Sequence, residues 1–151
     1  MTPSFRFRLE RVRAVRERKE KLAQRQLADA LSRRSSSESE LRGAEDRLEH
    51  AREQQRNLAS QHAALSGGDL LARQAFLERA EAQRHVRARE LAQREAEVAK
   101  RDAELANAAT EHEMLNRLRE RRRGEHDREV ARHEMGILDE LTAARFSRSR
   151  A

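Results

Sequence analysis

The feature that most constrains this chain is the absence of helix-breaking residues over two long runs. Its single proline is Pro3, and the stretch from residue 5 to 65 contains only one glycine, Gly43. Proline in a helix interior costs roughly 3 kcal/mol, so its absence lets a helix continue. The sequence predicts one coiled-coil hairpin with four consecutive parts: a helix at 5–65, a turn at 66–69, a helix at 70–146 and a disordered tail at 147–151.

Apolar residues along both runs recur with the period of a coiled coil. In the first run they alternate in steps of three and four, at Leu27, Ala30, Leu41, Ala44, Leu48, Ala51, Leu58 and Leu65, and further upstream at Phe5, Leu9 and Val12. In the second run they recur at multiples of seven, at Leu70, Leu77, Leu91, Val98 and Leu105. Two amphipathic helices joined by a short turn must fold back on each other to bury these stripes. The predicted fold class is therefore all-α, a long antiparallel two-helix coiled-coil hairpin.

The turn sets the expected register of the two helices. Gly67 and Gly68 can supply positive φ values to end the first helix, and Asp69 is a suitable N-cap for the second. Pairing outward from this turn brings Ala44 near Leu91 and Phe5 near Val130. Because a helix rises 1.5 Å per residue, the second helix is longer than the first. About fifteen of its residues then run past the N-terminus as a C-terminal helical overhang. We expect its apolar stripe to stay exposed, and the stripe consists of Met135, Ile137, Leu138, Leu141 and Phe146.

The composition argues against an enzyme. Charged residues make up 40% of the chain and aromatic residues 3%, and there is no cysteine, whereas average domains are about 25% charged. A core deep enough to surround a catalytic pocket needs more bulky apolar side chains. The six histidines are scattered and are expected to be solvated surface residues rather than metal ligands. We predict no catalytic activity, no cofactor, no metal and no small-molecule substrate.

Charge is concentrated at the two ends of the chain. Residues 1–19 carry seven basic and two acidic groups, residues 117–151 carry ten and seven, and residues 20–116 carry sixteen and eighteen. The arginine-rich run at 117–123 fits either nucleic-acid phosphates or a polar protein surface. Interspersed carboxylates and the lack of aromatic stacking groups favour the protein surface, so no nucleic acid is expected. Without a long apolar run, we expect a cytoplasmic protein.

Both ends of the chain resemble one known family. The opening Phe5-Arg6-Phe7-Arg8-Leu9-Glu10-Arg11-Val12 and the closing Leu118-Arg119-Glu120-Arg121-Arg122-Arg123, Leu138-Asp139-Glu140-Leu141 and Ala144-Arg145-Phe146 look like the ends of the flagellar export protein family FliJ. The resemblance implies an antiparallel coiled coil similar to the rotor stalk of rotary ATP synthases. It also implies that the open end of the hairpin enters the hexameric export ATPase FliI and promotes its ATP hydrolysis.

The resemblance further implies contacts with the export gate protein FlhA and with export chaperones, at the cytoplasmic face of the inner membrane, in support of flagellum assembly, motility and chemotaxis. The residues expected to contact the ATPase ring are Phe5, Phe7, Arg8, Leu9, Arg121, Arg122, Leu138, Leu141 and Phe146. The family's gate contact is an aromatic residue followed at i+4, i+7 and i+11 by mostly apolar groups. Here those positions are Phe76, Ala80, Gln83 and Arg87.

Three alternatives stay open from the sequence. The chain is also compatible with the equivalent stalk of a virulence-type secretion system. It is compatible with an arginine-rich helical protein that binds nucleic acid, which a steep salt dependence of binding would reveal. A homodimeric coiled coil of unbroken helices is the third, and the Gly67-Gly68 turn argues against it.

Overall fold

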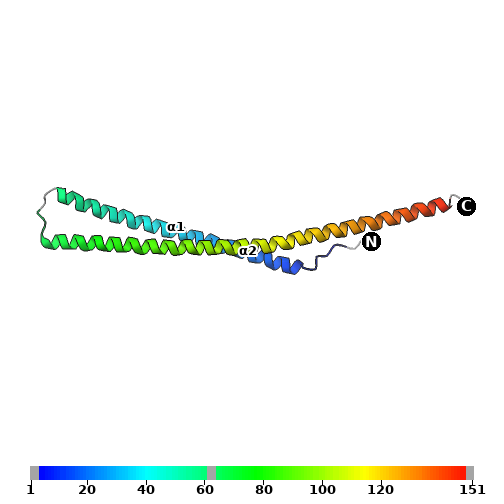
Figure 1. Cartoon of the computed structure of the whole chain (residues 1–151), viewed down its shortest axis with the longest axis horizontal. Helices are drawn as coiled ribbons and strands as arrows, with labels where there is room; N and C mark the ends of the chain where they lie inside the picture. The colour runs from blue at the N-terminus through cyan, green and yellow to red at the C-terminus, as the bar shows by residue number, and fades with distance from the viewer. Residues whose placement is uncertain (1–3, 61–63, 149–151) are drawn as a thin grey trace. The chain divides into compact units, whose positions relative to one another are not determined.

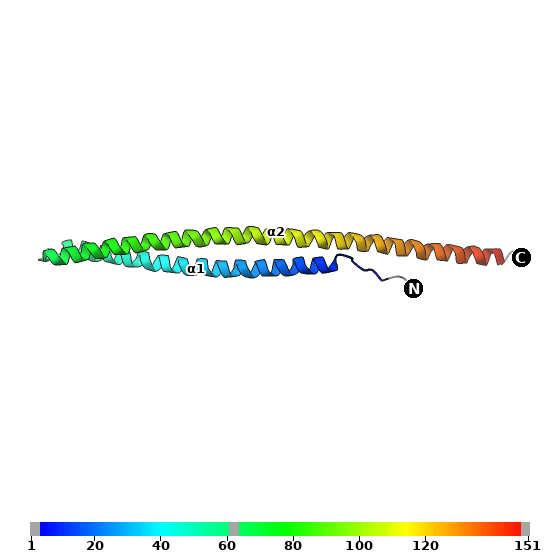
Figure 2. The same ribbon diagram turned by 90° about the horizontal axis from the view of Figure 1, so that it is seen from below.

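Two long helices make up most of the described part of the chain. The computed structural model describes residues 4–60 and 64–148 (Figure 1). Helix α1 spans Glu10–Ser60 and helix α2 spans Gly67–Arg148, and no strand occurs among the described residues. The two helices pack against each other and run in opposite directions, which confirms the predicted all-α, two-helix hairpin (Figures 1 and 2).

The contacts group the chain into two compact units. The first unit, Met1–Lys21 with Ala106–Ala151, combines the start of α1 with the second half of α2. The second unit, Leu22–Leu105, contains the rest of both helices and their connection. Each unit has its own kind of helix–helix interface.

The second unit is held by a narrow seam of small residues. Its buried side chains are Ala23, Ala30, Ala44, Leu48 and Ala51, four of which the heptad pattern predicted, and Ala23 extends the seam by one heptad. Small side chains allow the helix backbones to approach closely. On α2, the predicted heptad residues Leu77, Leu91, Val98 and Leu105 are half-buried. Ion pairs border the seam, at 2.7 Å between Arg87 and Glu40 and at 2.9 Å between Arg52 and Glu81.

The first unit has a largely polar interface. Ala108 is buried there, and charged, amide and imidazole groups form hydrogen bonds between the helices. Arg16 Nη1 lies 2.6 Å from Glu111 Oε2, and Lys19 Nζ lies 3.2 Å from the same oxygen. Val12, which the heptad pattern placed on the seam, is exposed instead. The apolar period therefore fails upstream of the alanine seam, because the face of α1 that meets α2 there is polar.

The start of α2 differs from its expected capping. Ser66 is the N-cap, and Asp69 is its partner three residues later: the Asp69 amide donates to Ser66 Oγ at 3.2 Å, and the Ser66 amide donates to Asp69 Oδ2 at 3.2 Å. This reciprocal pairing is a capping box, so Gly67 and Gly68 lie in the first turn of α2. Neither glycine has positive φ, contrary to the expectation.

The bounds of both helices shift with these caps. Helix α1 begins at Glu10 rather than residue 5, where the Glu10 amide donates to the Phe7 carbonyl at 3.1 Å, and it ends at Ser60 rather than residue 65. Helix α2 begins three residues earlier than expected and continues to Arg148. The predicted tail is thus helical at its first two residues, and 149–151 lie outside the described residues.

The register shifts as well. Phe5 contacts His126 rather than the region of Val130. In the second unit, Glu45 pairs with Arg84 at 3.6 Å, several positions short of the expected neighbourhood of Leu91. The prediction centred the connection on 66–69, whereas helix α1 already ends at residue 60 and α2 already begins at residue 67.

In the part of the chain that is described, neither helix offers a segment long and apolar enough to cross a membrane.

Candidate protein-binding surfaces

The N-terminal segment lies along α2 in the first unit and forms a groove with it. The rings of Phe5 and His126 are 5.7 Å apart and inclined by 60°, within the range typical of aromatic pairs. The groove has a volume of about 610 Å³. It is lined by Phe5, Arg6, Phe7, Arg8, Leu9, Leu118, Arg122, Glu125, His126 and Glu129. An apolar floor with both signs of charge around it suits a protein side chain or helix better than a polyanion.

Charged groups fix the first turn of α1 beside this groove. Glu10 Oε1 accepts hydrogen bonds from Arg13, and Arg119 Nε lies 3.6 Å from Glu10 Oε2. The hydrogen bond from Arg13 is the main reason that the pKa of Glu10 is lowered from its ordinary value of 4.5, with Arg119 adding to the effect. Glu10 therefore stays ionised at neutral pH and ties the start of α1 to α2.

His126 carries a buried nitrogen at the groove. Its Nδ1 makes no hydrogen bond among the described residues, and Oδ1 of Asp127 lies 3.6 Å away. The histidines were expected to be solvated, but the side chains of His112 and His126 are both largely covered at the helix interface. Sequence spacing held a signal for this: positions 112, 119 and 126 are seven apart and so share one face of α2.

The structure brings together about half of the predicted ring-contact residues. Phe5, Phe7, Arg8, Leu9 and Arg122 all line the groove. The remaining four are exposed on α2 outside it: Arg121, Leu138, Leu141 and Phe146. Four groove residues outside the predicted ring contact come from α2: Leu118, Glu125, His126 and Glu129.

Helix α2 continues as an exposed helix past the start of α1 in the first unit (Figures 1 and 2). Large apolar side chains lie open along it, with exposed fractions of 61% at Leu138, 57% at Leu141 and 72% at Phe146. Single exposed apolar residues are ordinary, but a series at helical spacing is typical of a protein-binding surface.

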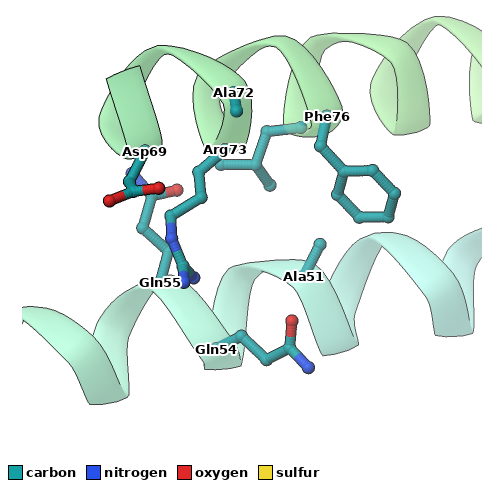
Figure 3. Close-up of a pocket in the computed structure, with 8 residues that line it drawn as sticks. Ala51, Gln54, Gln55, Asp69, Ala72, Arg73 and Phe76 are labelled. Carbon is teal, nitrogen blue, oxygen red and sulfur yellow. The ribbon is translucent and has the colours of Figure 1, made fainter. Parts of the chain in front are cut away.

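A second surface lies in the second unit, near the connection. Phe76 points from α2 toward α1 above Ala51 and is 51% exposed (Figure 3). It helps to line an open hollow of about 370 Å³. The hollow is lined by Ala51, Gln54, Gln55, Asp69, Ala72, Arg73, Phe76 and Leu77.

The four predicted gate residues are distributed between this surface and the helix interface. Phe76 and Gln83 are exposed, whereas Ala80 and Arg87 are half-buried. Arg87 Nη1 lies 2.8 Å from Glu90 Oε2 and 2.7 Å from Glu40 Oε2 of α1. The hydrogen bond to Glu90, followed by the charge of Glu40, raises the pKa of Arg87. Arg87 is therefore already engaged in joining the helices.

These features define a class of protein. Two paired helices present three features: a groove with apolar and charged walls, an exposed apolar part of α2, and the half-exposed ring of Phe76. Among residues 4–60 and 64–148, no group of three or more histidine and carboxylate side chains could hold a metal ion. The arrangement is typical of a coiled-coil protein whose exposed surfaces serve to bind other proteins.

Comparison with known proteins identifies the family. The family model of the flagellar FliJ protein matches residues 5–151. The chain belongs to the flagellar FliJ family, a non-catalytic family, and is a flagellar export-related protein. No curated protein matches the chain, and no solved structure matches it.

Proposed function

We propose that this protein is a stalk that binds the hexameric export ATPase FliI through the open end of its first unit and promotes ATP hydrolysis there. The observation that carries this proposal is the groove between the N-terminal segment and α2, with Phe5 packed on His126 and Arg122 at its edge. The exposed apolar part of α2 beyond it supplies a second contact, centred on Leu138 and Leu141.

The proposed mechanism is allosteric. A helical stalk has no catalytic group to offer the ATPase, so it acts only by binding some conformations of the ring subunits more tightly than others. Arg8 and Arg122 favour acidic ring surfaces, and Phe7 and Leu9 favour apolar ones. Binding that differs between subunits shifts their populations and so biases the hydrolytic cycle.

The second unit is proposed to contact the export gate protein FlhA. Phe76 and Gln83 are accessible for this contact, whereas Ala80 and Arg87 lie closer to the helix interface. We therefore expect the hollow beside Phe76 to matter more than Arg87, which is held by Glu40 and Glu90. Export chaperones are further proposed partners, and binding to these components would hold the protein at the cytoplasmic face of the inner membrane.

Substitution of the exposed apolar residues tests the ring contact. In the full chain, Leu138→Ser, Leu141→Ser and Phe146→Ser together should reduce stimulation of FliI ATPase activity toward its basal rate. A matched control substitutes three exposed apolar residues elsewhere, Leu31→Ser, Leu71→Ser and Val86→Ser. Circular dichroism checks that both variants stay helical. Equal stimulation by both variants and the unmodified chain would exclude the exposed part of α2 from the contact.

A further inference from the structure

Helix α2 has one face in the first unit that is already occupied. His112, Arg119 and His126 are seven residues apart and point toward the N-terminal part of the chain. Their partners there are Glu20 at 2.6 Å, Glu10 at 3.6 Å and the Phe5 ring at 5.7 Å. Because a helix turns 100° per residue, positions two and five residues beyond each of these lie on the opposite side of α2.

That opposite side carries a second stripe with coiled-coil spacing. Its positions alternate in steps of three and four, and we call them the outer stripe: Met114, Arg117, Arg121, Gly124, Arg128, Ala131, Met135 and Leu138. Met114 and Met135 are each 66% exposed. Exposed methionine is common on surfaces that bind helices, because its flexible side chain adapts to different partners. The surface is hollowed where Met114 and Arg117 meet Ala109. The stripe extends over roughly 36 Å of helix, at 1.5 Å per residue.

A row of carboxylates borders the outer stripe on one side. We call it the acidic row, and its members are seven residues apart: Glu113, Glu120, Asp127 and Glu134. All four are exposed. In a coiled coil, positions that directly flank the core contact the flanking residues of the partner helix and decide which partner is accepted. Two members also have partners within α2, since Arg117 Nε lies 2.8 Å from Glu113 and Arg123 Nε lies 4.0 Å from Asp127. These pairs are exposed and contribute little stability, so the four carboxylates still favour a partner with a basic flank.

We propose that the outer stripe docks one helix of a different protein, whose flank carries lysine or arginine against the acidic row. Opposite Arg121 and Arg128, this partner helix carries acidic or amide side chains, because an unpaired guanidinium in the contact would be unfavourable. Its remaining core positions are apolar, to cover Met114 and Met135. This inference goes beyond the proposed ATPase contact, with which the outer stripe shares Arg121 and Leu138.

Charge disfavours a second copy of this chain as the occupant. Two copies of this chain docked antiparallel through the outer stripe would place the acidic row against itself. A parallel pair would place Glu120 opposite Glu125 and Glu134 opposite Asp139 of the other copy, and only Asp127 would meet an opposite charge, at Arg132. It would also place Arg121 and Arg128 each against its own copy in the contact, so like charges again predominate.

Two synthetic helical peptides provide the probe. Both have apolar core positions with glutamate opposite Arg121 and Arg128, and they differ only in their flanks, which are lysine in one and glutamate in the other. Binding of each labelled peptide to the full chain is measured by fluorescence anisotropy at several salt concentrations. The lysine-flanked peptide should bind at least about tenfold more tightly, as expected from several flanking charge pairs acting together.

Reversal of the acidic row should reverse this preference. In the full chain, Glu113→Lys, Glu120→Lys, Asp127→Lys and Glu134→Lys together should make the glutamate-flanked peptide the tighter ligand. The control reverses four exposed acidic residues outside the acidic row, with the substitutions Asp46→Lys, Glu53→Lys, Glu95→Lys and Asp102→Lys. This control should keep the original preference, and circular dichroism should report the same helicity for both variants.

Three outcomes would overturn the proposal. They are binding of neither peptide, equal affinity for both, and self-association of the unmodified chain that the acidic-row reversal changes in sedimentation analysis. The acidic row contains no residue of the proposed ATPase contact, so stimulation of FliI is measured with the same variants. Equal affinity of the unmodified chain for the two peptides, with stimulation of FliI intact, would be a failure of this inference and not of the proposed function.

Discussion

Nδ1 of His112 lies 2.6 Å from Oε2 of Glu20, across the helix interface of the first unit. The other ring nitrogen, Nε2, lies 3.3 Å from Nδ2 of Asn116, and Arg13 donates to Asn116 Oδ1 at 3.4 Å. With Nε2 accepting from the amide, the ring proton resides on Nδ1 and is donated to Glu20. A short chain of hydrogen bonds thus takes the place of the apolar seam found in the second unit.

This pair predicts measurable coupling between the two helices. The side chains of His112 and Glu20 are only 16% and 22% exposed. A double-mutant cycle with His112→Ala and Glu20→Ala should give a coupling free energy of about 1 kcal/mol in urea unfolding. The control cycle uses Glu45 and Arg84, an exposed pair at 3.6 Å, whose coupling should be much smaller. Similar coupling in the two cycles would contradict a structural role for His112.

Gly43 offers a stabilising substitution. It lies in the middle of α1, and a Cβ added there meets no atom within 4 Å. Alanine is favoured over glycine by about 1 kcal/mol in a helix interior. Gly43→Ala should therefore raise the melting temperature by about 2–4 °C, as followed by circular dichroism. A lower melting temperature would mean that the helices approach each other at Gly43 more closely than described.

Asp69 should make the start of α2 sensitive to acid. Its hydrogen bonds from Ser66 lower the pKa of Asp69 from the ordinary value of 3.8. A carboxylate whose pKa is lower in the folded state stabilises that state above its unfolded pKa, and this contribution is lost as the pH falls through the folded pKa. NMR shifts of Gly68 and Leu70 should therefore leave their helical values with a midpoint below pH 3.8.

The capping partner provides the control for this titration. Ser66→Ala removes the hydroxyl that donates to Asp69 Oδ2 at 2.7 Å. The midpoint should then move upward, toward the ordinary value for an aspartate. An unchanged midpoint would show that the capping box does not set the pKa of Asp69.

Phe5 should anchor the N-terminal segment to α2. Removal of its ring in Phe5→Ala eliminates the contact with His126 and opens the groove. Trypsin should then cleave after Arg6 and Arg8 faster than in the unmodified chain, because the segment leaves α2 more often. Phe146→Ala serves as the control, since it removes a ring of the same size from an exposed position. Equal cleavage rates in both variants would argue against anchoring by Phe5.

The fold could be predicted from the sequence because the features that determine it are local and periodic. The lack of internal proline and the heptads through Ala30, Ala44 and Ala51 were sufficient to predict two antiparallel helices. The register was wrong because it depended on the connection, where Ser66 and Asp69 start α2 before the glycines can form a turn. Helix caps arise from single hydrogen bonds, which periodicity does not report.

The candidate site could be predicted only in part from the sequence. The aromatic and basic residues of the N-terminal segment were recognisable by resemblance, and Phe5, Phe7 and Leu9 do line a groove. His112 and His126 were missed because a histidine on a charged helix has the same local pattern whether it faces solvent or another helix. Only the pairing of α2 with the N-terminal part of the chain distinguishes these two cases.

The most direct test of the central claim is a titration of this protein into the export ATPase FliI of the same organism, with the rate of ATP hydrolysis as the measurement. The account predicts stimulation that saturates near one chain per ATPase hexamer and that weakens as salt screens Arg8 and Arg122. An unchanged hydrolysis rate at every ratio, without co-sedimentation of the two proteins, would contradict it.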